Sequence, residues 1–151
     1  MNYNRQGNPF QQNTDLEAIQ LLKEGLLGEQ MAIRGYEMIR HNSGSGQDKE
    51  LITSILRDER RHYFLLQEIF EERTDTVFEM AKASISMPMD FIDMIKTAIC
   101  DELEAVAFYE RLAGMLDCMR QKEIVLQILN DEKEHAQLLA GLYQRTPENE
   151  E

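Results

Sequence analysis

Six residues that a helical core normally excludes occur in this chain as two sets of three, separated by a constant offset of 73 residues. Each set has a glutamate followed, 30 residues later, by Glu-x-x-His. The residues are Glu29, Glu59 and His62, and Glu102, Glu132 and His135. Because a charge in an apolar interior must be paired, neutralised or bound by metal, the fold has to bring these residues together.

The repeat extends beyond these residues. An ungapped alignment of 29–66 with 102–139 has 13 identical positions out of 38. Three of the repeated pairs are Ala32 and Ala105, Tyr36 and Tyr109, and Asp58 and Asp131. Chance would give about two or three identities, so we interpret the chain as a duplicated helical hairpin with pseudo-twofold symmetry.

Apolar residues spaced alternately three and four positions apart predict an all-α chain. Thr14 or Asp15 is expected to cap the first helix, and Pro88 fits the first turn of the third. We expect helices at about 14–41, 48–73, 88–116 and 121–144.

The predicted connection at 74–87 is longer than a simple helix hairpin needs. Extended at about 3.3 Å per residue, it could run the length of a bundle. We therefore predict a four-helix bundle over 14–145, made of two hairpins joined by a long crossover. Residues 1–13 are predicted to be a disordered tail, and 146–151 a polar tail.

Composition narrows the possible partners and location. The 151 residues suit one domain, and the net charge of −12 argues against binding to nucleic acid or anionic membranes. The chain has no apolar run of about 18 residues, and its first residues do not form an export signal. Cys100 and Cys118 form no Cys-x-x-Cys pair, which favours reduced thiols and a cytoplasmic protein.

The buried polar residues point to metal. No Lys or Arg occupies an apolar seam position where it could pair with the carboxylates. One Glu from each of two helices, with Glu-x-x-His from each of two others, is the ligand set of di-iron and di-manganese carboxylate bundles. Oxygen-rich ligands with one nitrogen per metal favour iron or manganese over structural zinc. We predict two iron ions per chain, with manganese as the alternative.

The predicted ligand roles follow from the repeat. We assign Glu59 and Glu132 as bridging ligands, although the bridging and terminal roles could be exchanged. The other four residues would then be terminal ligands, namely Glu29, His62, Glu102 and His135.

Two further repeated pairs are candidates for supporting this site. Tyr36 and Tyr109 lie two turns after Glu29 and Glu102, so they are candidate catalytic-site residues whose hydroxyls could bond a ligand carboxylate on a facing helix. The alternative is a pair of ordinary core tyrosines. The aspartates before the Glu-x-x-His motifs could hold the ring N–H of a histidine, or could be exposed.

Two motifs resemble those of the ferritin-like superfamily, most closely its rubrerythrin and bacterioferritin branches. One is the Glu-x-x-Ala-x-x-x-Tyr that begins at Glu29, and the other is the Asp-Glu-x-x-His that begins at Asp131. The resemblance covers about residues 15–144. It implies a four-helix bundle, a di-iron site and reaction of Fe(II) with oxygen or hydrogen peroxide, which would connect the protein with oxidative stress.

The chain also departs from both branches. It has no paired Cys-x-x-Cys motifs, which form the rubredoxin module of rubrerythrins. Ala105 stands where rubrerythrin peroxidases have an additional Glu, and Arg60 where bacterioferritins have a haem-ligating Met. The resemblance therefore implies a stand-alone ferritin-like di-iron protein.

We expect an oxidoreductase that oxidises Fe(II) with oxygen or reduces peroxide, supplied by an external electron donor. The alternatives are iron sequestration or storage without turnover, a manganese catalase-like site, and a metal-free bundle that serves as an interaction module. A homodimer is expected because twofold symmetry is the commonest closed assembly.

Overall fold

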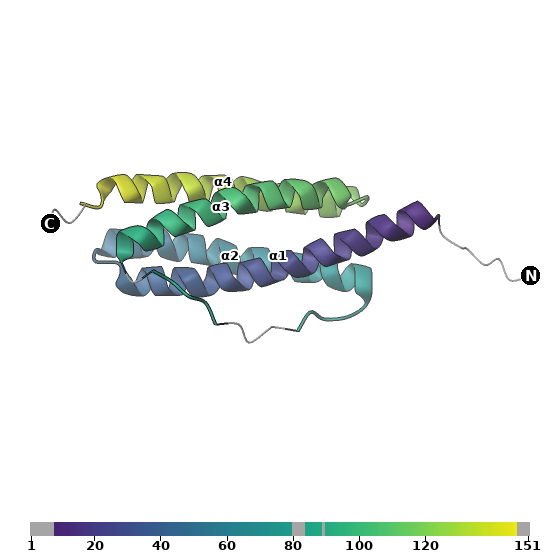
Figure 1. The fold of residues 1–151 in the computed structure, drawn as a ribbon, viewed down its shortest axis with the longest axis horizontal. Helices are drawn as coiled ribbons and strands as arrows, with labels where there is room; N and C mark the ends of the chain where they lie inside the picture. Colours follow the sequence, from purple (N-terminus) through teal and green to yellow (C-terminus); the bar gives the residue numbers. More distant parts are fainter. Residues whose placement is uncertain (1–7, 80–83, 89, 148–151) are drawn as a thin grey trace, which may run out of the picture.

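The computed structural model describes residues 8–79, 84–88 and 90–147, and over these residues it contains four α-helices and no strand. The helices form a bundle, as predicted (Figure 1). They are α1 (Pro9–Asn42), α2 (Gly46–Thr74), α3 (Phe91–Met115) and α4 (Met119–Arg145). Within the described part of the chain, no helix combines the length and apolarity that a membrane span needs.

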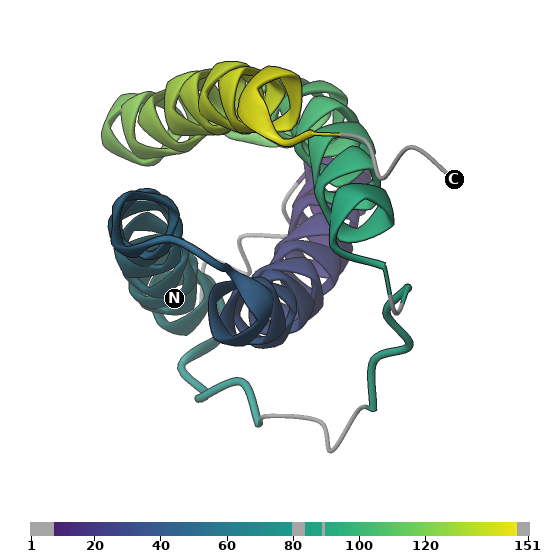
Figure 2. The ribbon, with the colours of Figure 1, turned by 90° about the vertical axis from the view of Figure 1, so that its left-hand side faces the viewer.

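The helices pair as two hairpins. α1 packs on α2 and α3 packs on α4, while α1 also meets α3 and α2 meets α4 (Figure 2). α3 begins at the same end of the bundle as α2, so the connection between them has to cover the length of the bundle (Figure 1). The predicted long crossover is therefore confirmed.

The first helix begins earlier than predicted, at Pro9 rather than near Thr14. The Asn8 side chain caps the helix by accepting a hydrogen bond from the backbone N–H of Phe10. Proline suits the first helical position because the N–H that it lacks would have no partner there. The predicted disorder over 1–13 is thus wrong for residues 9–13, and residues 1–7 lie outside the described part.

The third helix begins later than predicted. Asp90 caps it by accepting from the N–H groups of Ile92 and Asp93, so Pro88 precedes α3 rather than occupying its first turn. A carboxylate satisfies two orphan donors at this end, which fixes the start of the helix there. The predicted polar tail follows α4 at Thr146 and Pro147, and the rest of it lies outside the described residues.

The apolar core is divided into two clusters along the bundle. One contains Leu22, Leu26, Leu66 and Leu112. The other contains Ile39, Ile52, Ile95 and Leu139. Each fully buried side chain of this kind contributes about 1.5–3 kcal/mol. The buried polar residues lie between these two clusters.

Candidate metal centre

The polar layer contains all six of the predicted ligand residues, drawn from the four helices. α1 and α3 each supply one glutamate, while α2 and α4 each supply the glutamate and histidine of Glu-x-x-His. Each residue is 3% exposed or less. The members are Glu29, Glu59, His62, Glu102, Glu132 and His135.

The layer consists of two overlapping groups of possible ligands, each with its donor atoms within 4.8 Å of one another. Glu59 and Glu132 belong to both groups. The first group is completed by Glu29 and His62, and the second by Glu102 and His135. Two shared carboxylates, with one glutamate and one histidine on each side, form a donor set that could hold two metal ions.

Every residue of the layer has one buried atom without a hydrogen-bond partner. These atoms are Glu29 Oε2, Glu59 Oε1, His62 Nδ1, Glu102 Oε2, Glu132 Oε1 and His135 Nδ1. Two pairs of these atoms lie at ion-pair distance, namely His62 Nδ1 and Glu132 Oε1 at 3.0 Å, and His135 Nδ1 and Glu59 Oε1 at 2.9 Å. Each unsatisfied polar group costs about 1–3 kcal/mol. Bound cations would satisfy all six atoms, so the donor set fits metal.

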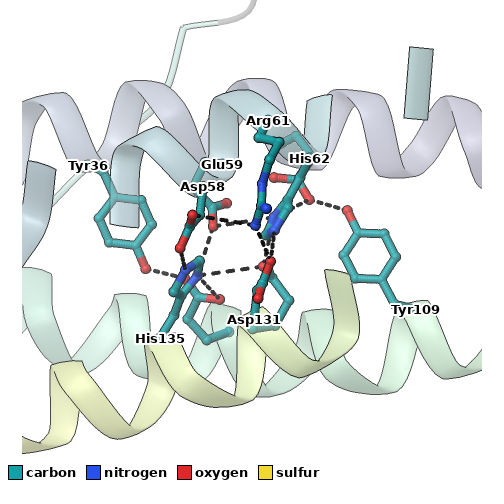
Figure 3. Close-up of polar contacts among 11 residues, drawn as sticks. Tyr36, Asp58, Glu59, Arg61, His62, Tyr109, Asp131 and His135 are labelled. Atoms are coloured by element: carbon teal, nitrogen blue, oxygen red, sulfur yellow. Dashed lines mark hydrogen bonds and ion pairs between the residues drawn. The ribbon is translucent and has the colours of Figure 1, made fainter. Parts of the chain in front are cut away.

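The outer nitrogen of each histidine faces an aspartate from the opposite hairpin (Figure 3). His62 Nε2 lies 2.9 Å from Asp131 Oδ2, and His135 Nε2 lies 3.0 Å from Asp58 Oδ2. A carboxylate can accept a hydrogen bond from Nε2–H, and this contact orients Nδ1 into the layer. Of the two interpretations of these aspartates, the structure supports the one in which they hold the histidine rings.

The two tyrosines join the hairpins in the same reciprocal way. Tyr36 donates a hydrogen bond to Glu102 Oε1, and Tyr109 donates one to Glu29 Oε1. Figure 3 shows the rings at opposite ends of the layer. The predicted contact with a carboxylate on a facing helix is therefore confirmed, while a catalytic role stays a prediction.

In the absence of a cation, burial favours the protonated form of the glutamates in the polar layer. Loss of solvent raises the pKa of Glu29 well above its usual value. The same cause, with neighbouring carboxylates, raises the pKa of Glu59 to about 8 and that of Glu132 to about 11. Burial lowers the pKa of His135, but the nearby Glu102 and Glu59 outweigh this and raise it to about 12. A metal entering the layer must therefore displace protons.

A cavity of about 480 Å³ opens onto the carboxylate side of the layer, between α1 and α3. Small residues line its walls, including Gly28 and Ala32 of α1 and Ala98 and Ala105 of α3. The four buried glutamates reach it, whereas the two histidines do not line it. A small molecule entering the cavity would therefore meet the layer from the carboxylate side.

The sequence interpretation missed a role for Arg61 beside the layer. Its Nη2 donates to Asp131 Oδ2 at 2.6 Å and lies 3.5 Å from Asp58 Oδ1. Helical geometry placed Arg61 off the apolar seam, and the repeat did not reveal it because its counterpart is Glu134. Only the three-dimensional arrangement identifies this contact.

The four-helix fold is shared with solved structures that are described as ferritin-like. The family model described as rubrerythrin matches residues 20–143, which is most of the chain. The chain therefore belongs to the rubrerythrin family.

The chain is also similar to individual proteins. The uncharacterized protein YhjR of Bacillus subtilis (strain 168) is 28% identical over 136 residues, covering 90% of this chain and 93% of YhjR. A conserved hypothetical protein from Mycobacterium tuberculosis has a TM-score of 0.78 at 17% identity, over 93% of this chain and 98% of that one. A ferritin-like, diiron-carboxylate protein from Bacillus anthracis str. Ames has a TM-score of 0.74 at 24% identity, over 86% of this chain and 97% of that one. At these identities the structures establish the shared fold.

Proposed function

We propose that this protein binds two iron ions per chain and is an oxidoreductase that reacts Fe(II) with oxygen or hydrogen peroxide. The observation that carries the proposal is the pair of overlapping groups of possible ligands, in which every member has a buried atom without a hydrogen-bond partner. Membership of the rubrerythrin family supports it. The four carboxylates and two imidazoles suit iron, with manganese as the alternative.

The residues have distinct proposed roles. Glu29 and His62 hold one ion, Glu102 and His135 hold the other, and two carboxylates are shared between them. The shared carboxylates are those of Glu59 and Glu132. Iron held by these residues would supply the electrons that reduce oxygen or peroxide.

The surrounding residues keep the ligands in place and limit access to them. Tyr36 and Tyr109 hold one oxygen of each terminal glutamate by donating a hydrogen bond. Burial and the adjacent glutamates raise the pKa of both hydroxyls, so they remain donors. The apolar clusters exclude water from the two ends, and the cavity between α1 and α3 admits a small oxidant.

Three parts of the proposal rest on the sequence alone. The external electron donor is a prediction, motivated by the lack of paired Cys-x-x-Cys motifs among the 151 residues. The homodimer and the cytoplasmic location stay predictions. Manganese catalase-like chemistry would use the same donor set and is the alternative that metal analysis separates.

The reaction is tested by loading the protein with Fe(II) without oxygen and then adding either oxygen or hydrogen peroxide. We expect Fe(II) to be oxidised faster than in buffer, and we expect the Glu132→Ala variant to lose this acceleration. Glu123→Ala, which changes an exposed glutamate on the same helix, is the matched control. If the protein binds two ions but neither oxidant reacts faster than in buffer, the proposed oxidoreductase activity is contradicted and iron sequestration is supported.

A further inference from the structure

Arg61 breaks the symmetry of the site. The histidines and their aspartate partners are repeated at an offset of 73 residues, but the residue at the corresponding offset from Arg61 is Glu134. The second hairpin therefore has an acidic residue where the first has a guanidinium. The difference lies one residue before each histidine ligand.

The guanidinium contacts the two aspartates unequally. Arg61 Nη2 lies 2.6 Å from Asp131 Oδ2, the same oxygen that faces His62 Nε2 at 2.9 Å (Figure 3). Its distance to Asp58 is 3.5 Å, and it is measured to Oδ1, whereas His135 faces Oδ2. Arg61 thus forms a charge-assisted hydrogen bond to the oxygen that serves one histidine, and only a marginal contact with the partner of the other.

We propose that Arg61 makes the two ends of the site unequal, so that a metal ion is held less tightly at the Glu29–His62 end than at the Glu102–His135 end. The inference rests on the proposed metal binding. Arg61 touches no ligand atom that faces a metal, so it is a positioning residue that acts through Asp131.

The physical reason is competition for one carboxylate oxygen. A guanidinium that shares Asp131 Oδ2 draws negative charge away from it, so this oxygen accepts less strongly from His62 Nε2–H. A histidine whose outer N–H is held less strongly is a less basic ligand at Nδ1. The positive charge of Arg61 also repels a cation at that end more than at the other.

The change can be tested without endangering the fold. The Arg61 side chain is 57% exposed, and its partner Asp131 is 27% exposed. Exposed ion pairs contribute little to stability, so replacing Arg61 should leave the bundle intact.

The test is an anaerobic titration with Co(II), followed by its visible absorption, which gives the two stepwise binding constants. Arg61→Gln removes the charge but keeps an amide donor, and Arg61→Lys keeps the charge. Arg60→Gln is the matched control, because Arg60 pairs with exposed Glu37 and has no recorded contact with either aspartate. We expect Arg61→Gln to tighten the weaker constant by about tenfold, the scale of an outer hydrogen-bond partner. Arg61→Lys and Arg60→Gln should leave that constant near its wild-type value.

A second variant tests the direction of the effect. Glu134→Arg puts a guanidinium at the corresponding position of the second hairpin, and we expect it to weaken the tighter constant. Suppose that Arg61→Gln binds two Co(II) ions, but that its weaker binding constant is unchanged or becomes weaker still. The proposed role of Arg61 is then overturned, while the proposed metal centre stands. Failure of the unmodified protein to bind two ions would instead contradict the proposed metal centre, and with it this inference.

Discussion

The first hairpin (α1 and α2) and the second (α3 and α4) hold each other's ligand residues by the same contacts in both directions. Tyr36 holds Glu102 as Tyr109 holds Glu29. The aspartate of each Glu-x-x-His helix faces the histidine of the other helix at nearly the same distance. Neither hairpin could therefore form the buried layer by itself.

Outside the layer the two hairpins differ. Arg61 corresponds to Glu134, and Gly28 on the cavity wall corresponds to Asp101. A change that leaves a buried polar group unpaired costs about 1–3 kcal/mol, whereas an exposed change costs little. The comparison shows that the polar layer and the contacts that hold it are repeated in both hairpins, whereas residues beside the layer make the two halves unequal.

The largest effect is expected from removing a carboxylate that both halves share. Glu59→Ala should prevent stoichiometric binding of both ions, because Glu59 belongs to both ligand groups. The loss of affinity should exceed the roughly 10–100-fold that follows loss of an outer hydrogen-bond partner. Elemental analysis after loading measures it, with Glu68→Ala, an exposed glutamate on α2, as the control. Two ions retained by Glu59→Ala would rule out the shared role.

Removing an unshared carboxylate should affect one half only. Glu29→Ala and Glu102→Ala are each expected to lose one ion and keep the other, since each glutamate belongs to one group. The same elemental analysis gives the number of ions per chain. If either variant loses both ions, the two groups do not bind separately and the comparison of halves fails.

Raising the pH should destabilise the metal-free protein. Glu59 has a folded pKa of about 8 against a usual 4.5, so the folded state keeps a proton that the unfolded state has lost. Its contribution to stability is full below pH 4.5 and disappears as the pH rises to about 8, and the raised pKa of Glu132 continues the loss to about 11. Thermal unfolding with a chelator should show this loss, and metal-loaded protein should show less of it. If the Tm measured in the presence of chelator rises between pH 4.5 and about 11, the buried glutamates are not protonated in the folded protein.

The tyrosines test whether the interior is as symmetric as it looks. Tyr36→Phe and Tyr109→Phe each remove a buried hydrogen bond to a glutamate, so each should lower the free energy of unfolding by about 1–3 kcal/mol. Denaturant unfolding of the metal-free variants gives both values. Similar losses are expected, and a large loss in only one variant would mean that the reciprocal contacts are not equivalent.

The smallest effect is expected from narrowing the cavity. Ala105→Leu places a larger side chain on the wall of the cavity, so we expect slower reaction with peroxide by a few-fold and unchanged metal content. Ala107→Leu, at an exposed position of the same helix, is the control. An unchanged rate in Ala105→Leu would mean that the oxidant reaches the layer by another path.

Much of the fold was predictable because the sequence carries it twice. The apolar spacing predicts the four helices, and the repeated Glu and Glu-x-x-His motifs predict which residues form the buried polar layer. The start of α1 was missed because Asn8 and Pro9 lie in a polar segment that reads as a tail, although together they form a helix cap.

Features without a repeated signal could not be predicted. Arg61 acts through a contact with the facing helix, and sequence spacing within one helix does not reveal such a pair. The cavity depends on how closely α1 and α3 approach around small residues such as Gly28 and Ala98, and these carry no chemical signature of their own.

The most direct test of the metal centre is the iron content per chain, measured by elemental analysis after anaerobic loading with Fe(II), with optical spectra recorded as air is admitted. The structure predicts two irons per chain and a new near-ultraviolet absorption on exposure to air. No stoichiometric iron or manganese under any loading condition would contradict the metal centre, and the buried histidines and glutamates would then be held by their ion pairs with one another.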